Sequence, residues 1–171
     1  MPEFSKNVWA PWRMEYIEGL GEPDSGCFLC RYLAAAADDA KNHVLWRSPH
    51  SLVLLNRFPY TNGHLLIAPA QHVATLDKLP EEVLLELSAR LRDAMRILDD
   101  ALGPQGYNVG MNLGRCAGAG LPDHLHWHIV PRWSGDTNFV PVIGDVRVMP
   151  QSLERTAERC RAAMQRLGLG A

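Results

Sequence analysis

The sequence carries almost no excess charge and lacks long apolar runs. Seventeen lysines and arginines nearly balance nineteen aspartates and glutamates, which leaves a net charge of −2 over 171 residues. Such a balance gives no overall attraction to nucleic acid or to an anionic membrane, so any affinity for an anion must be local. No apolar run approaches the roughly 18–20 residues that cross a bilayer. We therefore expect neither nucleic acid nor a membrane among the partners.

The start of the chain and its small number of cysteines indicate the compartment in which the protein works. Residues 1–6 lack the apolar core of a secretory signal peptide, and we expect a cytoplasmic protein. Four cysteines in a reducing compartment do not predict a disulfide framework. Cys27 and Cys30, which are separated by two residues, instead indicate metal or redox chemistry. Cys116 and Cys160 stand alone and are interpreted as ordinary small residues.

The length and composition predict one domain over residues 1–171. A hydrophobic content of 47% supplies a sizeable core, but the chain is short for two domains. Within it we expect an aromatic N-terminal extension at 1–26 and a C-terminal loop and helix at 133–171. Apolar spacing and turn residues predict helices at 31–40, 80–102 and 151–167 and strands at 44–46, 52–55, 64–68 and 107–113. This order indicates an α+β fold, with a mostly antiparallel sheet, a long amphipathic helix and a C-terminal helix.

Residues 124–132 carry a histidine at every second position. His124, His126 and His128 alternate with Leu125 and Trp127, and this period is typical of a strand whose imidazoles share one face. Imidazole has an unperturbed pKa near neutrality, so one ring can attack while another donates a proton. The middle ring is placed to act as a nucleophile, and its neighbours can orient it, stabilise charge or hold a metal.

A glycine-rich segment leads into these histidines. Gly114, Gly118 and Gly120 leave backbone N–H groups free to converge on an anion. Histidines beside such a cradle suggest phosphorus chemistry through a covalent phosphohistidine-type intermediate. Other interpretations remain open at this point: a zinc site of three histidines, three structural histidines with buried partners, or glycines that form an ordinary turn.

Residues 124–130 resemble the signature of the histidine triad superfamily, in which three histidines alternate with apolar residues and two apolar residues follow. The segments around Asn56, Gly63–His64 and residues 67–69 extend the resemblance. It implies an α+β domain that dimerises and binds a nucleotide near the sheet. It also implies that His126 attacks the α-phosphate, that His128 and the loop contact the phosphate, and that Asn56 and His64 belong to the nucleotide site.

Flanking segments are similar to a subgroup, the bacterial diadenosine tetraphosphate (Ap4A) phosphorylases. The similar segments are residues 9–13, 118–120 and 131–139. The resemblance implies phosphorolysis of Ap4A to ADP and ATP through a nucleotidyl group on His126. Alternatives are a water-dependent hydrolase of dinucleoside polyphosphates or nucleoside phosphoramidates, and a nucleotide-binding protein without activity. Many triad hydrolases carry Gly-Gln-Ser in the loop, whereas Ala119 stands here, so backbone donors at Gly118 and Gly120, with Asn112, are expected to replace the missing hydroxyl.

The resemblance also implies a metal site. In zinc-bearing members a Cys-x-x-Cys pair, a later histidine and the first triad histidine bind one zinc ion. The matching positions are Cys27, Cys30, His72 and His124. Two thiolates and two imidazoles form a closed tetrahedral set, which is typical of a structural zinc site. Such an ion would fix His124 and, through it, the strand that carries the nucleophile.

Overall fold

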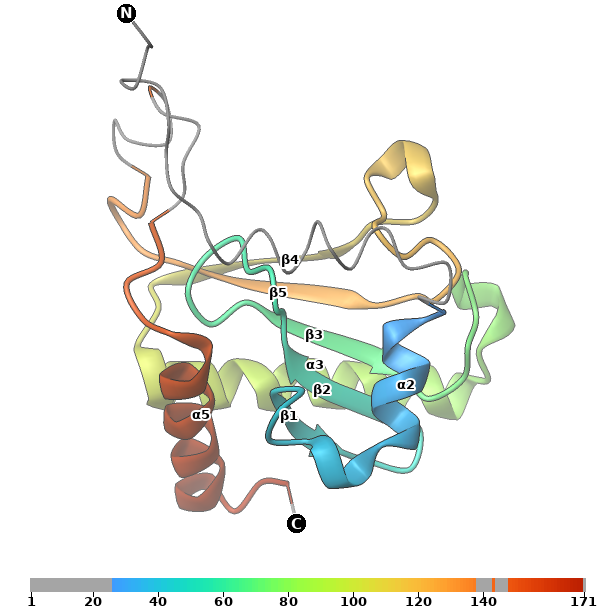
Figure 1. Cartoon of the computed structure of the whole chain (residues 1–171), viewed down its shortest axis with the longest axis horizontal. Coiled ribbons are helices and arrows are strands. Elements are labelled where there is room, and N and C mark those ends of the chain that lie inside the picture. Colours follow the sequence, from blue (N-terminus) through green and yellow to red (C-terminus); the bar gives the residue numbers. More distant parts are fainter. Residues whose placement is uncertain (1–25, 138–142, 144–147, 171) are drawn as a thin grey trace, which may run out of the picture.

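In the computed structural model, residues 26–137, 143 and 148–170 are described. The aromatic segment at 1–25 and part of the loop after residue 137 lie outside these ranges, so the expectations for them stay predictions. The structure has an α+β architecture built on one antiparallel sheet (Figure 1). No helix among the described residues is both long enough and apolar enough to span a membrane.

The sheet has five strands in the order β1-β2-β3-β5-β4. Their bounds are Val44–Arg47 (β1), Ser51–Leu55 (β2), Leu65–Pro69 (β3), Gly106–Met111 (β4) and Trp127–Arg132 (β5). Every neighbouring pair is antiparallel, in agreement with the mostly antiparallel sheet that the order of elements predicted. β5 is an inner strand between β3 and β4, so His128 lies on a strand that is paired on both sides.

Two helices cover one face of the sheet, and a shorter helix lies on the other (Figure 1). The first two are α3 (Glu81–Leu102) and α5 (Leu153–Leu167), and the short one is α2 (Phe28–Ala34). The larger core lies between the sheet and α3 and α5, and a smaller apolar cluster lies between the sheet and α2. Leu125 and Ile129 belong to the larger core, so His128 faces the opposite side of the sheet.

The long helix follows its predicted bounds. Glu81 and Glu82 occupy the first turn of α3, where negative charge complements the helix dipole. Gly103 ends the helix in the left-handed conformation, with φ of 59°, and its N–H donates to the carbonyls of Leu98 and Asp99.

The first helix was predicted too late in the sequence. It begins at Phe28 and ends at Ala34, and residues 36–38 form a separate 3-10 turn. Cys27 is its N-cap, because the Sγ atom accepts a hydrogen bond from the Cys30 N–H at 3.5 Å. The consequence is that Cys30 lies on the first turn of a helix. The regular ladder of β5 also starts later than the alternation predicted, so His124 and His126 precede it.

Candidate active site and metal cluster

His126 and His128 lie side by side at the start of β5, with ring centroids 4.9 Å apart. The Nδ1 atom of His126 is 2.9 Å from the carbonyl oxygen of His124. A carbonyl can only accept a hydrogen bond, so Nδ1 carries the proton and Nε2 of His126 keeps its lone pair. The arrangement therefore presents a nitrogen that can attack an electrophile.

A chain of hydrogen bonds sets the opposite tautomer on His128. The Tyr60 backbone N–H donates to Nδ1 of His64 at 3.1 Å, and the Asn56 amide donates to the same atom at 3.3 Å. The other nitrogen of His64, Nε2, must then hold the proton, and it donates to Nδ1 of His128 at 3.0 Å. His128 is left with Nε2–H as its donor. Two adjacent rings thus offer one lone pair and one N–H group.

Burial keeps His128 uncharged. The pKa of His128 falls from 6.5 to about 4, mainly because of burial and to a smaller extent because of the neighbouring His126. The Tyr60 ring lies nearly parallel to the His128 ring, with centroids 5.8 Å apart and an angle of 16°. Tyr60 also contacts the His64 ring at 4.7 Å. The sequence alone does not identify Tyr60 as part of this site, since an aromatic residue in a turn gives no sign of which ring it will cover.

The tautomer and charge of His128 can be measured directly. In a nitrogen–proton NMR correlation at pH 6, we expect a neutral ring with its proton on Nε2 and a titration midpoint at about 4. The unfolded chain takes up this proton nearer 6.5, so the contribution of His128 to stability is present above 6.5 and is lost as the pH falls toward 4. A proton on Nδ1 would refute the relay through His64, and a midpoint near 6.5 would refute the effect of burial on the pKa of His128.

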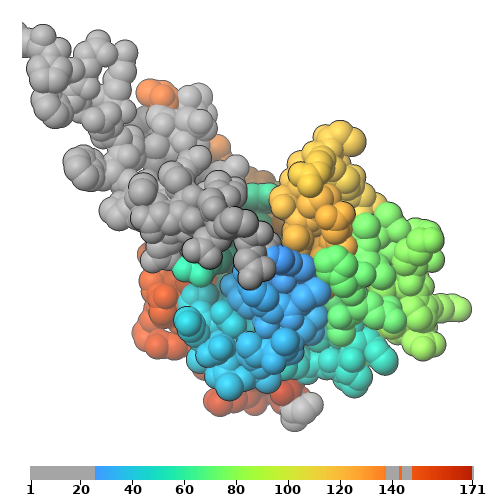
Figure 2. Space-filling view, turned by 45° about the vertical axis from the view of Figure 1, so that its right-hand side comes forward, coloured from blue at the N-terminus to red at the C-terminus, as the bar shows by residue number. Residues whose placement is uncertain are grey.

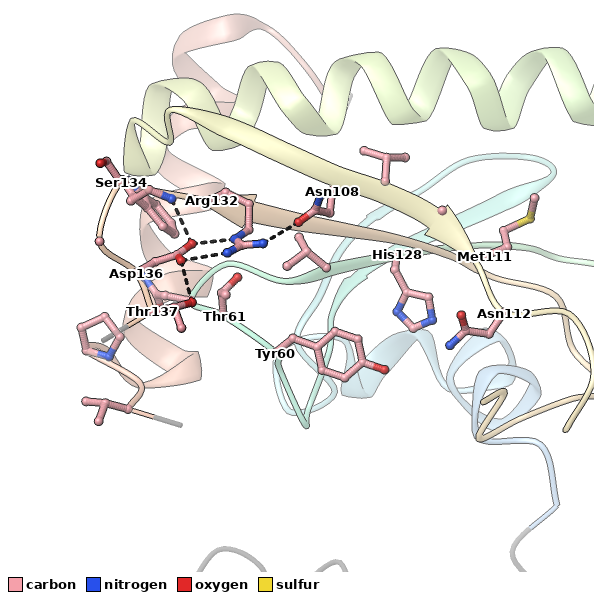
Figure 3. Close-up of a pocket in the computed structure, with 18 residues that line it drawn as sticks. Tyr60, Thr61, Asn108, Met111, Asn112, His128, Arg132, Ser134, Asp136 and Thr137 are labelled. Carbon is pink, nitrogen blue, oxygen red and sulfur yellow. Dashed lines mark hydrogen bonds and ion pairs between the residues drawn. The ribbon is translucent and has the colours of Figure 1, made fainter. Parts of the chain in front are cut away.

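A groove of about 870 Å³ begins at His128 and runs along β4 and β5 (Figure 3). Its walls come from these two strands, from the turn at 60–62 and from the segment 133–137. Gly110 of β4 lies directly opposite His128, and Asn108 lies opposite Val130. At the far end Arg132 donates to both carboxylate oxygens of Asp136, at 2.6 and 2.9 Å. This pairing holds the pKa of Asp136 well below its usual range.

The glycine-rich loop projects beside α2 in the space-filling view (gold in Figure 2). Gly114 and Gly118 adopt positive φ angles of 81° and 83°, which favour glycine. The Asn112 amide donates to the Gly118 carbonyl at 3.4 Å, and this bond ties the loop to the end of β4. Asn112 also lines the groove, close to His128. A phosphate role for Asn112, Gly118 and Gly120 stays a prediction.

A second cluster of ligating side chains lies beside the triad. The Cys27 Sγ is 3.0 Å from Nδ1 of His124, and the Cys30 Sγ is 3.2 Å from Nδ1 of His72. The four candidate ligand atoms lie within 4.8 Å of one another. Ligands of a tetrahedral zinc ion are separated by roughly 3.3–3.8 Å, given the usual bond lengths. The spacing and the donor set therefore fit one zinc ion.

The surroundings of this cluster orient its histidines. The Nε2–H of His124 donates to the Pro69 carbonyl at 2.9 Å, which leaves the Nδ1 lone pair directed at the thiols. The Leu125 N–H donates to the Val73 carbonyl at 2.7 Å, and this bond holds the segment that carries His72 alongside His124. Burial raises the pKa of the Cys27 thiol, a cost that a bound cation would offset.

The imidazole of His124 lies in the cysteine cluster, at the position that the resemblance implied for a metal ligand. The structure revises the expectation for His64. His64 is fully buried, so it lies behind His128 and cannot contact a nucleotide directly. Its position indicates that it orients His128. Asn56 uses its amide nitrogen on His64 and accepts from the Phe58 N–H at 2.9 Å, and its contact with ribose stays a prediction.

Comparison with known proteins decides the family. The sequence profile of the HIT domain matches residues 37–135. The chain belongs to the histidine triad (HIT) family. It is 36% identical to an AP-4-A phosphorylase of Mycobacterium tuberculosis, over 88% of this chain and 80% of that protein. It is also 30% identical to an adenosine 5'-monophosphoramidase of Schizosaccharomyces pombe, over 62% of this chain and 74% of that protein.

A solved structure agrees with this assignment. The zinc-bound histidine triad family protein of Mycobacterium smegmatis superposes with a TM-score of 0.66 and 28% identity, over 84% of this chain and 98% of that chain. With this family membership, the chain is a nucleotide-processing enzyme, a nucleotidyltransferase or a hydrolase.

Proposed function

We propose that the chain cleaves dinucleoside polyphosphates of the Ap4A type by transfer of a nucleotidyl group to His126. The observation that carries the proposal is the pair of adjacent rings with opposite tautomers. His126 offers a lone pair on Nε2, and His128 offers an N–H group. The centroids of the two rings are 4.9 Å apart. A nucleophile and a hydrogen-bond donor at this spacing suit attack on a phosphorus atom whose leaving oxygen needs stabilisation.

The reaction proceeds in two displacements. In the first, Nε2 of His126 forms a bond to the α-phosphorus, and the bond from that phosphorus to the bridging oxygen breaks. The leaving nucleotide departs with both bonding electrons, and the Nε2–H group of His128 hydrogen-bonds the departing oxygen. In the second, an oxygen of inorganic phosphate attacks the same phosphorus and releases His126. With Ap4A as substrate the products are ATP and ADP, and the atoms of both balance.

We also propose that Cys27, Cys30, His72 and His124 hold a structural zinc ion. The ion would supply a fixed cross-link between α2, the segment after β3 and the start of β5, and it would take no part in bond breaking. Its influence would reach the nucleophile through one residue. The ring of His124 belongs to the cluster, and the carbonyl of His124 accepts the proton that sets the His126 tautomer.

The acceptor distinguishes phosphorolysis from hydrolysis. We propose phosphate, supported by the similarity to the AP-4-A phosphorylase over 88% of the chain. The test is to incubate the enzyme with Ap4A, with and without inorganic phosphate, and to separate the nucleotides. Phosphate-dependent ADP supports phosphorolysis, whereas AMP formed without phosphate would refute it. The same AMP would support the second candidate, a hydrolase, which the similarity to the phosphoramidase favours.

We propose a homodimer that forms along β4. Among the described strands β4 is the edge of the sheet, and within residues 26–137 and 148–170 no strand pairs with its outer side. Val109 and Leu113, at this edge and just beyond it, are 40% and 42% exposed. A second copy that paired with β4 would cover both. Sedimentation at micromolar concentration should give twice the mass of the 171-residue chain, and a monomer would refute the pairing.

A further inference from the structure

The groove beyond His128 lies on one side of the catalytic pair. His128 lines it, whereas His126 is not among the described residues that do (Figure 3). From His128 the groove continues past Val130 to Arg132, along one face of β5. Four residues of a strand span about 13 Å. The groove is therefore much longer than a leaving group of a few atoms requires.

Stereochemistry connects this groove to the departing part of the substrate. Displacement at phosphorus places the attacking and leaving atoms roughly in line, on opposite sides of the phosphorus. If Nε2 of His126 attacks, the leaving oxygen lies away from His126, on the side of the His128 donor. The groove that starts at His128 is thus on the path of the leaving group.

The walls of the groove change in character along its length. Near His128 the opposite residue on β4 is Gly110. A Cβ atom added to Gly110 would meet no atom within 4 Å, so the groove is wide at this end. The side-chain amide of Asn108 follows toward Arg132, whereas that of Asn112 lies beyond the end of β4, at the His128 end of the groove. Both amides can donate to phosphate oxygens.

The far end is nearly neutral. Arg132 donates to Asp136 through two nitrogens and to the Asn108 Oδ1 through a third, at 2.7 Å, so its charge is already paired. Val130 and Pro150 add apolar surface beside it. An uncharged group with polar edges, such as a base with its ribose, fits this end better than a phosphate does.

We propose that this groove binds the leaving nucleotide, with the second nucleoside of a dinucleoside polyphosphate at the Arg132 end. The inference rests on the proposed attack by His126 and deepens it, because it explains how the enzyme selects a dinucleotide over a mononucleotide. Both halves of the substrate contribute to binding, one at the triad and one about 13 Å along β5.

The test places a bulky side chain in the groove, away from the atoms that react. Asn108 is opposite Val130, two residues beyond the entrance, and Asn108→Phe places a ring in the path of the second nucleoside. Binding is measured by calorimetry in a His126→Ala background, which removes turnover. We expect the Kd of Ap4A to rise by about 10-fold or more, and the Kd of AMP by less than about 3-fold.

Leu85→Phe is the control. It adds a ring at an exposed position of α3, which is not among the described residues that line the groove. We expect it to leave both affinities unchanged. The proposal is overturned if Asn108→Phe binds Ap4A as its parent does, or if it loses AMP and Ap4A equally.

The binding assay also separates this inference from the proposed reaction. If the wild-type enzyme does not cleave Ap4A but Asn108→Phe still discriminates between the two ligands, the reaction fails and the groove assignment stands. If the wild type cleaves Ap4A and Asn108→Phe binds it normally, the groove assignment fails alone.

Discussion

His126→Ala is expected to lower kcat for Ap4A by about 10⁴-fold or more, because it removes the nitrogen that forms the covalent bond. AMP should still bind within a few-fold of the wild-type affinity, since His128 and the surrounding donors remain. The measurements are initial rates by separation of nucleotides, and calorimetry with AMP. Loss of a nucleophile thus predicts a large change in kcat and a small change in binding.

The matched control is His50→Ala. His50 is an exposed histidine in the turn between β1 and β2. Its backbone N–H donates to the Glu86 carboxylate at 3.3 Å and its carbonyl accepts from the Ala70 N–H at 2.8 Å, and neither bond uses the ring. Its removal should leave kcat unchanged. Substantial turnover by His126→Ala, or an equal loss in His50→Ala, would assign the nucleophile to another group.

Cys27→Ser should release zinc and lower the melting temperature by roughly 10 °C. Removal of a tetrahedral ligand breaks the cross-link between α2 and the segment that enters β5, and about 3 kcal/mol shifts the melting temperature of a chain of this size by that amount. Because His124 would lose its anchor but keep its bond to Pro69, we expect kcat to fall far less than in His126→Ala. Metal analysis and thermal melting measure the two effects.

Cys116→Ser is the control for this substitution. Cys116 is exposed in the glycine-rich loop and is not part of the cluster. It should retain one zinc per chain and the wild-type melting temperature. The metal assignment is wrong if purified wild-type protein contains no zinc, or if Cys27→Ser retains a full equivalent.

Periodicity predicted the parts of the fold that follow from local spacing. The three- and four-residue spacing of apolar residues gave the bounds of α3 almost to the residue. The alternation placed Leu125 on the face opposite the imidazoles, and Leu125 packs in the larger core. The start of α2 was missed because a cysteine thiol caps it, and cysteine is not among the residues that usually indicate a helix start.

The relay to His128 depends on long-range pairing that spacing cannot reveal. His64 reaches His128 because β3 pairs with β5 in the register that sets Leu66 opposite His128. The stacking of Tyr60 depends on the path of the turn before β3, where Gly63 has a φ of 78° and lies close to Leu102. A sequence identifies the residues of such a network only after the register of the strands is known.

A covalent nucleotidyl group on His126 tests the account most directly. The enzyme is mixed with Ap4A in the absence of phosphate, quenched at alkaline pH after one turnover and digested, and the peptides are analysed by mass spectrometry. We predict one adenylyl group on the peptide that contains His126, which disappears when phosphate is added before the quench and is absent in His126→Ala. An adduct that persists in His126→Ala, or turnover by the wild type with no adduct at any time, would contradict the account.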